Sequence, residues 1–263
     1  MPVPFIAVVG LLLSTISAVH SVAPRFVAPP ANAQFDYQIG GAYQPPPGVR
    51  VVSRDRKASP AAGLYNICYV NAFQTQSDEI DWWQQHHDNL LLRDRTGEYV
   101  IDGEWGENLL DISTPAKRSA IASILNGWID GCAASGFDAV EPDNQDSFDR
   151  SDGLLTQNQA LALISLIAPH AHADGLAIAQ KNTTSFGSAG KRAGLDFAIA
   201  EECQDYDECG DYTSVYANHV IVIEYTKAPF KKACKNFGSK LTIVLRDVLV
   251  TPPGSETYQY GAC

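Results

Sequence analysis

Eight short apolar runs, separated by segments with helical periodicity, constrain the fold of this chain more than any other feature. Each run is apolar or β-branched on both faces and is bounded by Gly, Asp or Asn, as in parallel strands covered on both sides. The runs begin at Phe35, Val49, Gly63, Gly136, Gly175, Leu195, His219 and Leu241. Eight strands that alternate with helices favour a closed α/β fold, the (β/α)8 TIM barrel, over an open doubly wound sheet, which remains the alternative.

Helical periodicity is clearest in two segments between these runs. Thr114-Pro115 supplies an N-cap and a first-turn proline for a helix over 115–135, and a second helix is expected over about 156–173. Apolar residues recur in the first of them at helical spacing, which provides a stripe that can pack on strands. Shorter helices fit residues 186–192, 212–217 and 228–237.

Two parts of the chain depart from a regular barrel. The connections after the first two runs, GAYQPPPG and KASPAAG, are too short and too rich in proline for good helices. The barrel is therefore expected to be irregular in its first two βα units. Residues 73–111 form a long, acidic and aromatic stretch, which we expect to be a loop-plus-helix insertion after the third strand.

The N-terminal residues differ from the rest of the chain. Residues 1–23 contain no Lys, Arg, Asp or Glu, and an apolar run from Phe5 to Leu13 is followed by small residues. This pattern predicts a secretory signal peptide over 1–23, although the usual basic start is missing. A membrane anchor is the alternative, but the run is too short to span a bilayer comfortably. Residues 24–263 are then one barrel domain of a secreted, extracellular protein.

Cysteine usage agrees with export. The chain has six cysteines, none of them in CxxC spacing, so we expect up to three disulfides and no structural zinc site. Cys203 and Cys209 are close enough to close a small loop, while the full connectivity stays open. Asn182-Thr183-Thr184 is also a glycosylation sequon.

Acidic side chains outnumber basic ones, 30 to 19, for a formal net charge of −11. Nucleic acids and anionic membranes need a basic surface, so neither is expected as a partner. An acidic surface is compatible with a cationic ligand, and equally with a surface that only keeps a secreted protein soluble.

Polar side chains gather where the expected strands end, and in this type of barrel the carboxyl ends of the strands face the active site. Burying so many charges without partners would be costly, which favours a polar cleft. In strand order, these side chains are Asp36, Tyr37 and Gln38; Arg54 and Asp55; Tyr69 and Asn71; Glu141, Asp143 and Asn144; Lys181 and Asn182; Glu201 and Glu202; Glu224 and Tyr225; Arg246 and Asp247.

Glycoside hydrolysis needs two carboxylates on opposite sides of the scissile bond. Asp143 or Glu141 on the fourth strand and Glu201 or Glu202 on the sixth can lie across a cleft, since those strands are two apart on the ring. A single acidic residue at a strand end more often caps a helix or forms a salt bridge. Acidic pairs on two such strands favour the catalytic interpretation.

Five segments together resemble the polygalactosaminidase-type glycoside hydrolase family (endo-α-1,4-polygalactosaminidase). They are FDYQIGGAY, VVSRDR, GLYNICYVNAFQ, GFDAVEPDN and FAIAEEC, and the likeness spans roughly residues 35–250. The resemblance implies a TIM-barrel catalytic domain that cleaves α-1,4-linked galactosamine polymers. Carried over onto these motifs, the catalytic pair falls on Asp143 of EPDN and Glu201 of AEEC.

The resemblance also implies a set of sugar-binding side chains and a cationic amino-sugar polysaccharide as the partner, which an acidic cleft would attract. The expected substrate-binding residues are Asp36, Tyr37, Asp55, Asn71, Glu141, Asn144, Lys181, Glu202, Glu224 and Tyr225. The aromatic residues Trp82, Trp83, Trp105, Tyr43 and Tyr69 are candidates for stacking on sugars, and packing inside the insertion is the alternative for the adjacent tryptophans.

We expect an endo-acting, retaining hydrolase in which Asp143 is the nucleophile and Glu201 the general acid and base. It should act as a monomer without a cofactor or a metal. Two alternatives remain, an α-galactosidase-like exported glycosidase and a non-catalytic carbohydrate-binding barrel. A serine hydrolase is disfavoured because the chain has no GxSxG motif.

Overall fold

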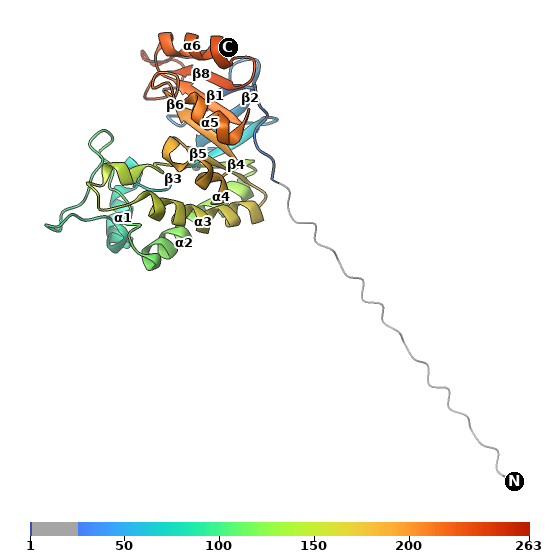
Figure 1. Ribbon diagram of the computed structural model, residues 1–263. Helices are drawn as coiled ribbons and strands as arrows, with labels where there is room; N and C mark the ends of the chain where they lie inside the picture. The colour runs from blue at the N-terminus through green and yellow to red at the C-terminus, as the bar shows by residue number, and fades with distance from the viewer. Residues whose placement is uncertain (2–25) are drawn as a thin grey trace.

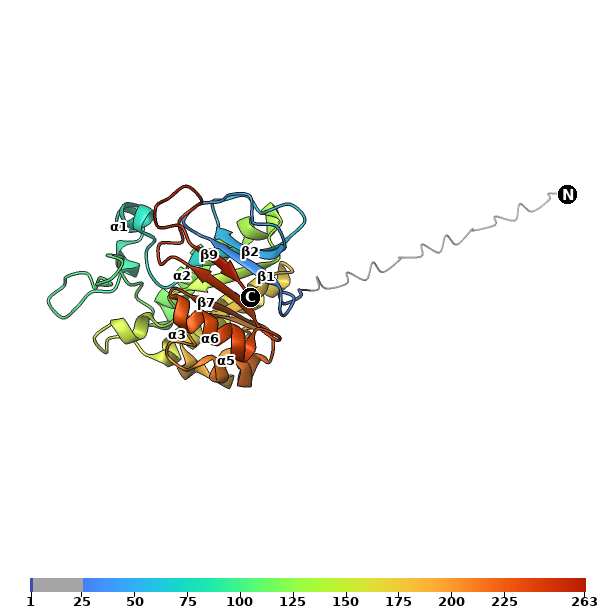
Figure 2. The same ribbon diagram turned by 90° about the horizontal axis from the view of Figure 1, so that it is seen from above.

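The computed structural model describes residue 1 and residues 26–263 of the chain. Apart from Met1, the predicted signal peptide lies outside the described residues. In the described part, eight parallel strands follow one another around a sheet in chain order (Figures 1 and 2). They are β1 (Gln34–Gln38), β2 (Val49–Asp55), β3 (Tyr65–Asn71), β4 (Ala139–Asp143), β5 (Ala177–Lys181), β6 (Phe197–Glu201), β7 (Val220–Glu224) and β8 (Thr242–Arg246). The predicted TIM barrel is confirmed, and each strand coincides with its predicted apolar run or extends at most one residue beyond it.

The ring closes where β8 lies beside β1. The backbone N–H of Ala33 donates to Thr242 Oγ1 at 3.1 Å, and Arg246 forms an ion pair with Asp36 at 3.0 Å. A short ninth strand, β9 (Tyr260–Ala262), pairs antiparallel with β8 beside this seam. The ninth strand was not predicted from the sequence, because three residues near a chain end carry no periodicity that marks a strand.

The strands separate two apolar cores. Inside the barrel, large side chains such as Phe35 and Phe197 share one cluster with the small Ala139, Ala177 and Ala179. This mixture of sizes fills a barrel interior, which has room for bulky residues from only some of the strands. The second cluster lies between the outward side chains of the strands and the helices that cover them.

The helices match the sequence predictions to within three residues at each end. They are α2 (Pro115–Ser135), α3 (Gln157–Ala173), α4 (Ser188–Arg192), α5 (Cys209–Tyr216) and α6 (Lys227–Phe237). Thr114 caps α2, and Thr156 forms a capping box with Gln159 at the start of α3. Figure 1 shows α2 and α3 side by side on one flank of the barrel, with α6 at the opposite end of the molecule.

Both predicted irregularities are present. The described connections from β1 to β2 and from β2 to β3 contain no helix. After β3, the insertion contains η1 (Ser77–Glu79), α1 (Ile80–His86) and η2 (Asp88–Leu90), followed by loops that project from the barrel (Figure 1). Short helical turns also follow β4, as η3 (Ser147–Arg150), and β5, as η4 (Thr184–Phe186).

All six cysteines lie in the described part and form three disulfides, Cys68–Cys132, Cys203–Cys209 and Cys234–Cys263. The second closes the small loop expected from the sequence, and the third ties the C-terminus to α6. Over residues 26–263, we find no helix with the length and apolar character needed to cross a bilayer.

The seam predicts a large cost for removing one partner of its ion pair. Arg246 and Asp36 are both fully buried, so Arg246→Met should lower the free energy of unfolding by about 3–5 kcal/mol, because it leaves the Asp36 carboxylate buried without its cation. Urea denaturation measures this. The double variant Asp36→Leu/Arg246→Met should recover much of the loss.

The exposed pair Lys232–Asp207 provides the matched control, since Lys232→Met should change stability by less than about 1 kcal/mol. An equal, small effect of both single variants would contradict a structural role for the seam.

Candidate active site

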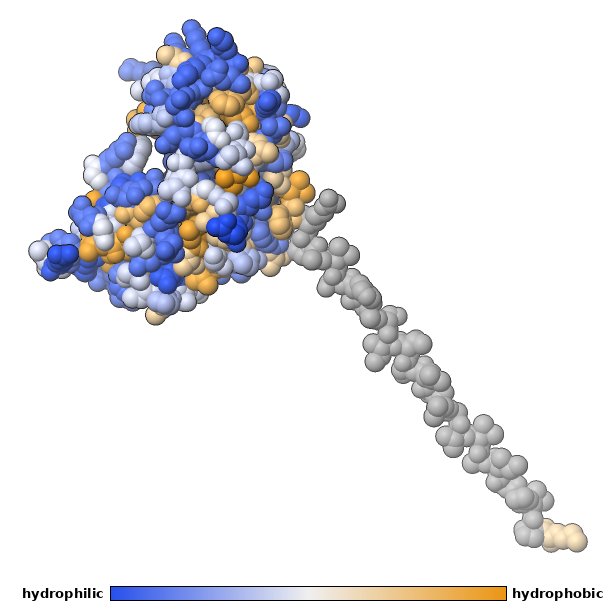
Figure 3. Space-filling model, viewed as in Figure 1, coloured by the Kyte–Doolittle hydropathy of each residue, from blue (hydrophilic) through white to orange (hydrophobic). Residues whose placement is uncertain are grey.

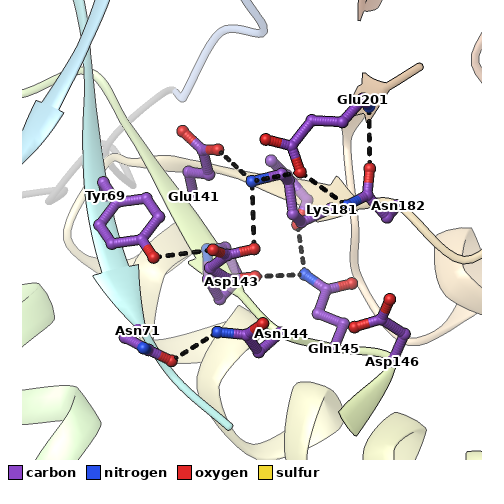
Figure 4. Close-up of polar contacts among 12 residues, drawn as sticks. Tyr69, Asn71, Glu141, Asp143, Asn144, Gln145, Asp146, Lys181, Asn182 and Glu201 are labelled. Carbon is purple, nitrogen blue, oxygen red and sulfur yellow. Dashed lines mark hydrogen bonds and ion pairs between the residues drawn. The ribbon is translucent and has the colours of Figure 1, made fainter. Parts of the chain in front are cut away.

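The ammonium group of Lys181 lies at the centre of the polar residues at one end of the barrel (Figure 4). Its Nζ is 3.2 Å from Glu141 Oε1, 3.1 Å from Asp143 Oδ1 and 3.3 Å from Glu201 Oε2. The Lys181 side chain is only 2% exposed. Burial alone would lower the pKa of Lys181, but the three carboxylates outweigh it and hold that pKa well above its usual value.

Strand alternation explains why these four side chains meet. Glu141 and Asp143 are two residues apart on β4, so both point to the same face of the sheet, and Lys181 and Glu201 end β5 and β6. Alternate residues nearer the starts of these strands, such as Ala179 and Ile199, belong to the interior cluster. The four polar groups therefore continue the inward-facing rows of apolar side chains.

Glu141 forms the floor of the site and is fully buried. It accepts hydrogen bonds from Tyr37 Oη at 2.9 Å and from Ser53 Oγ at 2.6 Å. Burial raises the pKa of Glu141 to about 6, although the charge of Lys181 opposes the shift. Glu141 is therefore placed to fix Lys181 and Tyr37 from below.

Asp143 lies nearer the opening, with a side chain that is 16% exposed. Tyr69 Oη donates to its Oδ2 at 2.7 Å. Burial would raise the pKa of Asp143, but Lys181 and the Tyr69 hydroxyl outweigh burial and hold that pKa below its ordinary value. A carboxylate held ionised in this way is suited to act as a nucleophile.

Glu201 faces Asp143 across Lys181 and is 23% exposed. It accepts a hydrogen bond from Asn182 Nδ2 at 2.8 Å and another from the Tyr225 hydroxyl. The backbone N–H of Glu201 in turn donates to Asn182 Oδ1 at 2.9 Å. Asn182, the first residue of the sequon, thus uses both ends of its amide to hold Glu201, and a glycan there would fill the site.

Left-handed backbone conformations follow the key residues on three adjacent strands. Asn144 has φ 62°, Asn182 φ 51°, Thr183 φ 55° and Glu202 φ 55°. Asparagine accepts this region readily, whereas it is costly for a β-branched residue such as threonine. These residues come directly after Asp143, Lys181 and Glu201, where the chain leaves β4, β5 and β6.

A cavity of about 840 Å³ opens above these carboxylates. Nine carboxylate side chains line it, against one cation among the described lining residues, Arg150. Arg150 already forms ion pairs with Asp102 at 2.7 Å and with Asp146 at 2.9 Å. Figure 3 shows a mostly hydrophilic surface on the face in view. The acidic lining residues are Asp102, Glu104, Glu107, Asp143, Asp146, Asp149, Glu201, Glu202 and Glu208.

The structure divides the residues proposed from the sequence into two groups. Tyr37, Asp143, Asn144, Glu201, Glu202 and Tyr225 line the cavity, as do the aromatic Tyr69 and Trp105. The remaining predicted residues do not line it. They are Asp36, Asp55, Asn71, Glu141, Lys181 and Glu224.

Of the residues outside the lining, Lys181 and Glu141 lie beneath it as described above, and the others hold neighbouring parts of the protein. Asp36 pairs with Arg246, and Asp55 accepts a hydrogen bond from Gln76 at 2.9 Å. Asn71 donates to Glu107 at 2.8 Å and accepts from Asn144 at 2.9 Å.

Three predicted aromatic residues lie elsewhere, and one of them, Tyr43, donates a hydrogen bond from its hydroxyl to Asp36 at 2.9 Å. Trp82 and Trp83 are outside the cavity lining, and Trp83 is fully buried in the core of the insertion. The position of these two tryptophans therefore agrees with packing inside the insertion, which was the alternative to stacking on sugars.

Residues of the insertion that the sequence analysis did not single out complete the cavity wall. Glu107 lines it and is held by Asn71 and by Ser77 Oγ at 3.2 Å. Burial raises the pKa of Glu107 to about 7. Asp102 holds Arg150 from the same side. The acidic composition of residues 73–111 indicated that this segment could contribute carboxylates to a cleft, but composition alone does not show which of them face the cavity.

Two groups of possible metal-binding side chains occur among the described residues. One contains Cys203 and Cys209, whose sulfurs are already joined in a disulfide, together with Glu224. The other, Asp130, His170 and Asp174, lies at the surface of α2 and α3. Neither belongs to the acidic cavity.

Comparisons with known proteins agree with this geometry. The sequence model of glycoside-hydrolase family GH114 matches residues 16–262. A comparison with curated proteins finds no match. The structure of Ega3 from Aspergillus fumigatus in complex with galactosamine superimposes with a TM-score of 0.72 at 22% identity, covering 94% of this chain and 100% of that one.

More distant structures share the barrel. The glycoside hydrolase domain of PelA from Pseudomonas aeruginosa has a TM-score of 0.55 at 12% identity, covering 86% of this chain and 98% of that one. The α-galactosidase TtGalA from Thermus thermophilus in complex with stachyose has a TM-score of 0.50 at 11% identity, covering 88% of this chain and 64% of that one. At such identities the likeness concerns the fold.

Glu224 predicts a pH-dependent stability. It is fully buried, its Oε2 has no hydrogen-bond partner among the described residues, and burial raises its pKa to about 7. Between about pH 4.3 and pH 7, the Glu224 carboxyl group is ionised in the unfolded chain but still protonated in the native state. Because the native state then binds more protons than the unfolded state, the free energy of unfolding falls as the pH rises through this range. Glu224→Gln should therefore stabilise the protein by about 1–3 kcal/mol at pH 8 and much less at pH 4.

Thermal unfolding at both pH values measures the difference, with the exposed Glu98→Gln as control. The same gain at pH 4 and pH 8 would rule out titration of Glu224 as its cause.

Proposed function

Since the chain belongs to glycoside-hydrolase family GH114, we propose that it cleaves α-1,4-linked, galactosamine-containing polysaccharide with Asp143 and Glu201 as its catalytic pair. The observation that carries this proposal is the contact of both carboxylates with the single ammonium group of Lys181 below an acidic cavity. The two catalytic residues are those that the resemblance implied.

The separation of the two carboxylates supports a retaining mechanism. Asp143 Oδ1 and Glu201 Oε2 lie 3.1 Å and 3.3 Å from Lys181 Nζ, so these oxygens cannot be farther apart than the sum of the two distances. Retaining glycosidases place their carboxyl groups about 5–5.5 Å apart, whereas inverting ones leave about 6.5–9.5 Å for a water molecule. The arrangement favours direct attack by a carboxylate on the sugar.

The surroundings of Asp143 support its role as the nucleophile of a double displacement, and Glu201 is the partner carboxyl group across Lys181. Asp143, held ionised by Lys181 and Tyr69, attacks the anomeric carbon while Glu201 gives a proton to the departing glycosidic oxygen. Glu201 then takes a proton from the water that cleaves the glycosyl–Asp143 ester. Asn182 and Tyr225 keep Glu201 oriented through both steps.

The charge of the cavity supports a cationic amino sugar as the substrate unit. Free amino groups on galactosamine are ammonium ions near neutral pH, and nine carboxylates line the cavity. Arg150 does not oppose this attraction strongly, because Asp102 and Asp146 hold its guanidinium group. The Aspergillus fumigatus relative Ega3 was solved in complex with galactosamine, which agrees with this choice of substrate.

We propose endo action and export for this enzyme as well. Trp105 and Tyr206, 47% and 69% exposed, form an open rim from which a long chain can extend. Three disulfides agree with an oxidising, extracellular setting and with the signal peptide expected over residues 1–23.

If Asp143 and Glu201 are the catalytic pair, removing either carboxylate should abolish most of the activity. Asp143→Asn and Glu201→Gln should each lower reducing-end release from a partly deacetylated α-1,4-linked galactosamine polymer by about a thousandfold or more, while both variants stay folded. Glu202→Gln is the matched control, because it neighbours Glu201 and lines the same cavity without contacting Lys181. This control should retain activity within about tenfold.

Other outcomes would point to other functions. Cleavage of neutral galactosides alone would favour the α-galactosidase-like alternative. Binding of the polymer without release of any sugar end would favour a non-catalytic barrel.

A further inference from the structure

A second hollow lies beside the catalytic cavity, over the carboxyl ends of β7 and β8. Its volume is about 750 Å³, and Tyr225 and Val248 form a wall that both hollows share. Tyr225 therefore contacts Glu201 on one side and lines the second hollow on the other. The two hollows are therefore neighbours at the carboxyl end of the barrel.

The segment that builds the second hollow is anchored at several points. Residues 247–259 run from β8 to β9, and β9 pairs with β8. The disulfide Cys234–Cys263 fixes the end of the chain to α6. Gln259 Nε2 donates to the carbonyl of Arg246 at 3.1 Å. The hollow is thus held in shape before any ligand arrives, which lowers the entropic cost of binding.

Tyr258 provides a supported aromatic face in this hollow. The Arg246 guanidinium carbon lies 5.6 Å from the centre of its ring, and Tyr43 meets the ring edge-on at 6.0 Å. Arg246 is itself fully buried and paired with Asp36. A ring held by such neighbours is a ready platform for the apolar face of a sugar.

The two hollows differ sharply in charge. Nine carboxylates and one paired arginine line the catalytic cavity. The charged residues lining the second hollow are Asp247, Glu256 and Lys227, so that it is nearly neutral. Both oxygens of Asp247 already accept backbone hydrogen bonds, from Thr251 and Gln259. Nothing comparable to the acidic lining of the cavity is present here to attract an ammonium group.

We propose that the second hollow is a subsite for an uncharged sugar ring of the same chain whose cationic rings occupy the catalytic cavity, with Tyr258 as its stacking platform. This inference rests on the proposed function for the identity of the polymer. It makes the enzyme selective for chains in which uncharged rings, such as N-acetylated ones, lie next to cationic rings.

The test compares two α-1,4-linked galactosamine oligomers of equal length, one fully deacetylated and one N-acetylated over half of its rings. Their affinities are measured by calorimetry in the Asp143→Asn background, which prevents cleavage. Tyr258→Ala should weaken binding of the half-acetylated oligomer by about tenfold and leave the fully cationic one nearly unchanged. Tyr258→Phe, which keeps the ring, should bind both oligomers like the parent.

Tyr99→Ala is the matched control, since Tyr99 also lies against an arginine, 4.1 Å from Arg93, but outside both hollows. It should change neither affinity. If Tyr258→Ala does not fold, Tyr258→Leu keeps apolar packing while it removes the flat face, and the same loss is expected.

Equal losses for both oligomers, or no loss for either, overturn the inference. Failure of the wild type to cleave any such oligomer would instead overturn the proposed function. The binding comparison would still decide whether Tyr258 recognises an uncharged ring.

Discussion

The structure depends on one buried ammonium group that three carboxylates share. Lys181 could not remain charged in the barrel mouth without Glu141, Asp143 and Glu201, because a buried ion without partners is very costly. The carboxylates depend equally on Lys181, since two of them are neighbours on one strand and would otherwise repel each other. The shared contacts with Lys181 therefore fix the ends of β4, β5 and β6 relative to one another, and this constraint sets the geometry of the proposed catalytic pair.

Neighbouring side chains hold that arrangement, and two irregular segments of the chain surround it. Tyr37 and Ser53 fix Glu141 from below, Tyr69 fixes Asp143, and Asn182 fixes Glu201. The insertion after β3 supplies one wall of the acidic cavity, and the segment after β8 builds a nearly neutral hollow on the other side. In the proposed function, the irregular additions to the barrel select the polymer and the strand ends carry out the reaction.

Much of this architecture could be predicted from the sequence. Strands and helices were found because their burial patterns repeat locally, and the caps at Thr114 and Thr156 depend on residues within one turn. The predicted barrel and the predicted family are both confirmed. The rule that the carboxyl ends of barrel strands face the active site also predicted that Asp143, Lys181 and Glu201 would gather at one end of the barrel.

Local sequence patterns do not predict side-chain contacts between segments that are distant in the chain. Nothing near Asn71 shows that it holds Glu107, 36 residues away, or that Asp36 pairs with Arg246, 210 residues away. Glu224 ends its strand as Glu201 does, yet it lies buried beside a disulfide. Whether a polar residue at a strand end faces the cavity or supports it depends on such partners. Asn182 is a further example. Its sequence neighbours form a glycosylation sequon, but its contacts in the structure are hydrogen bonds with Glu201.

The central claim is that Lys181 holds Asp143 and Glu201 close enough for a carboxylate, rather than a water molecule, to attack the sugar. The most direct test is the anomeric configuration of the first product released from an α-1,4-linked galactosamine oligomer, followed by proton NMR before mutarotation. The account predicts an α-anomer, which is retention of configuration. A β-anomer as the first product would mean inversion, and would contradict the double displacement derived from this geometry.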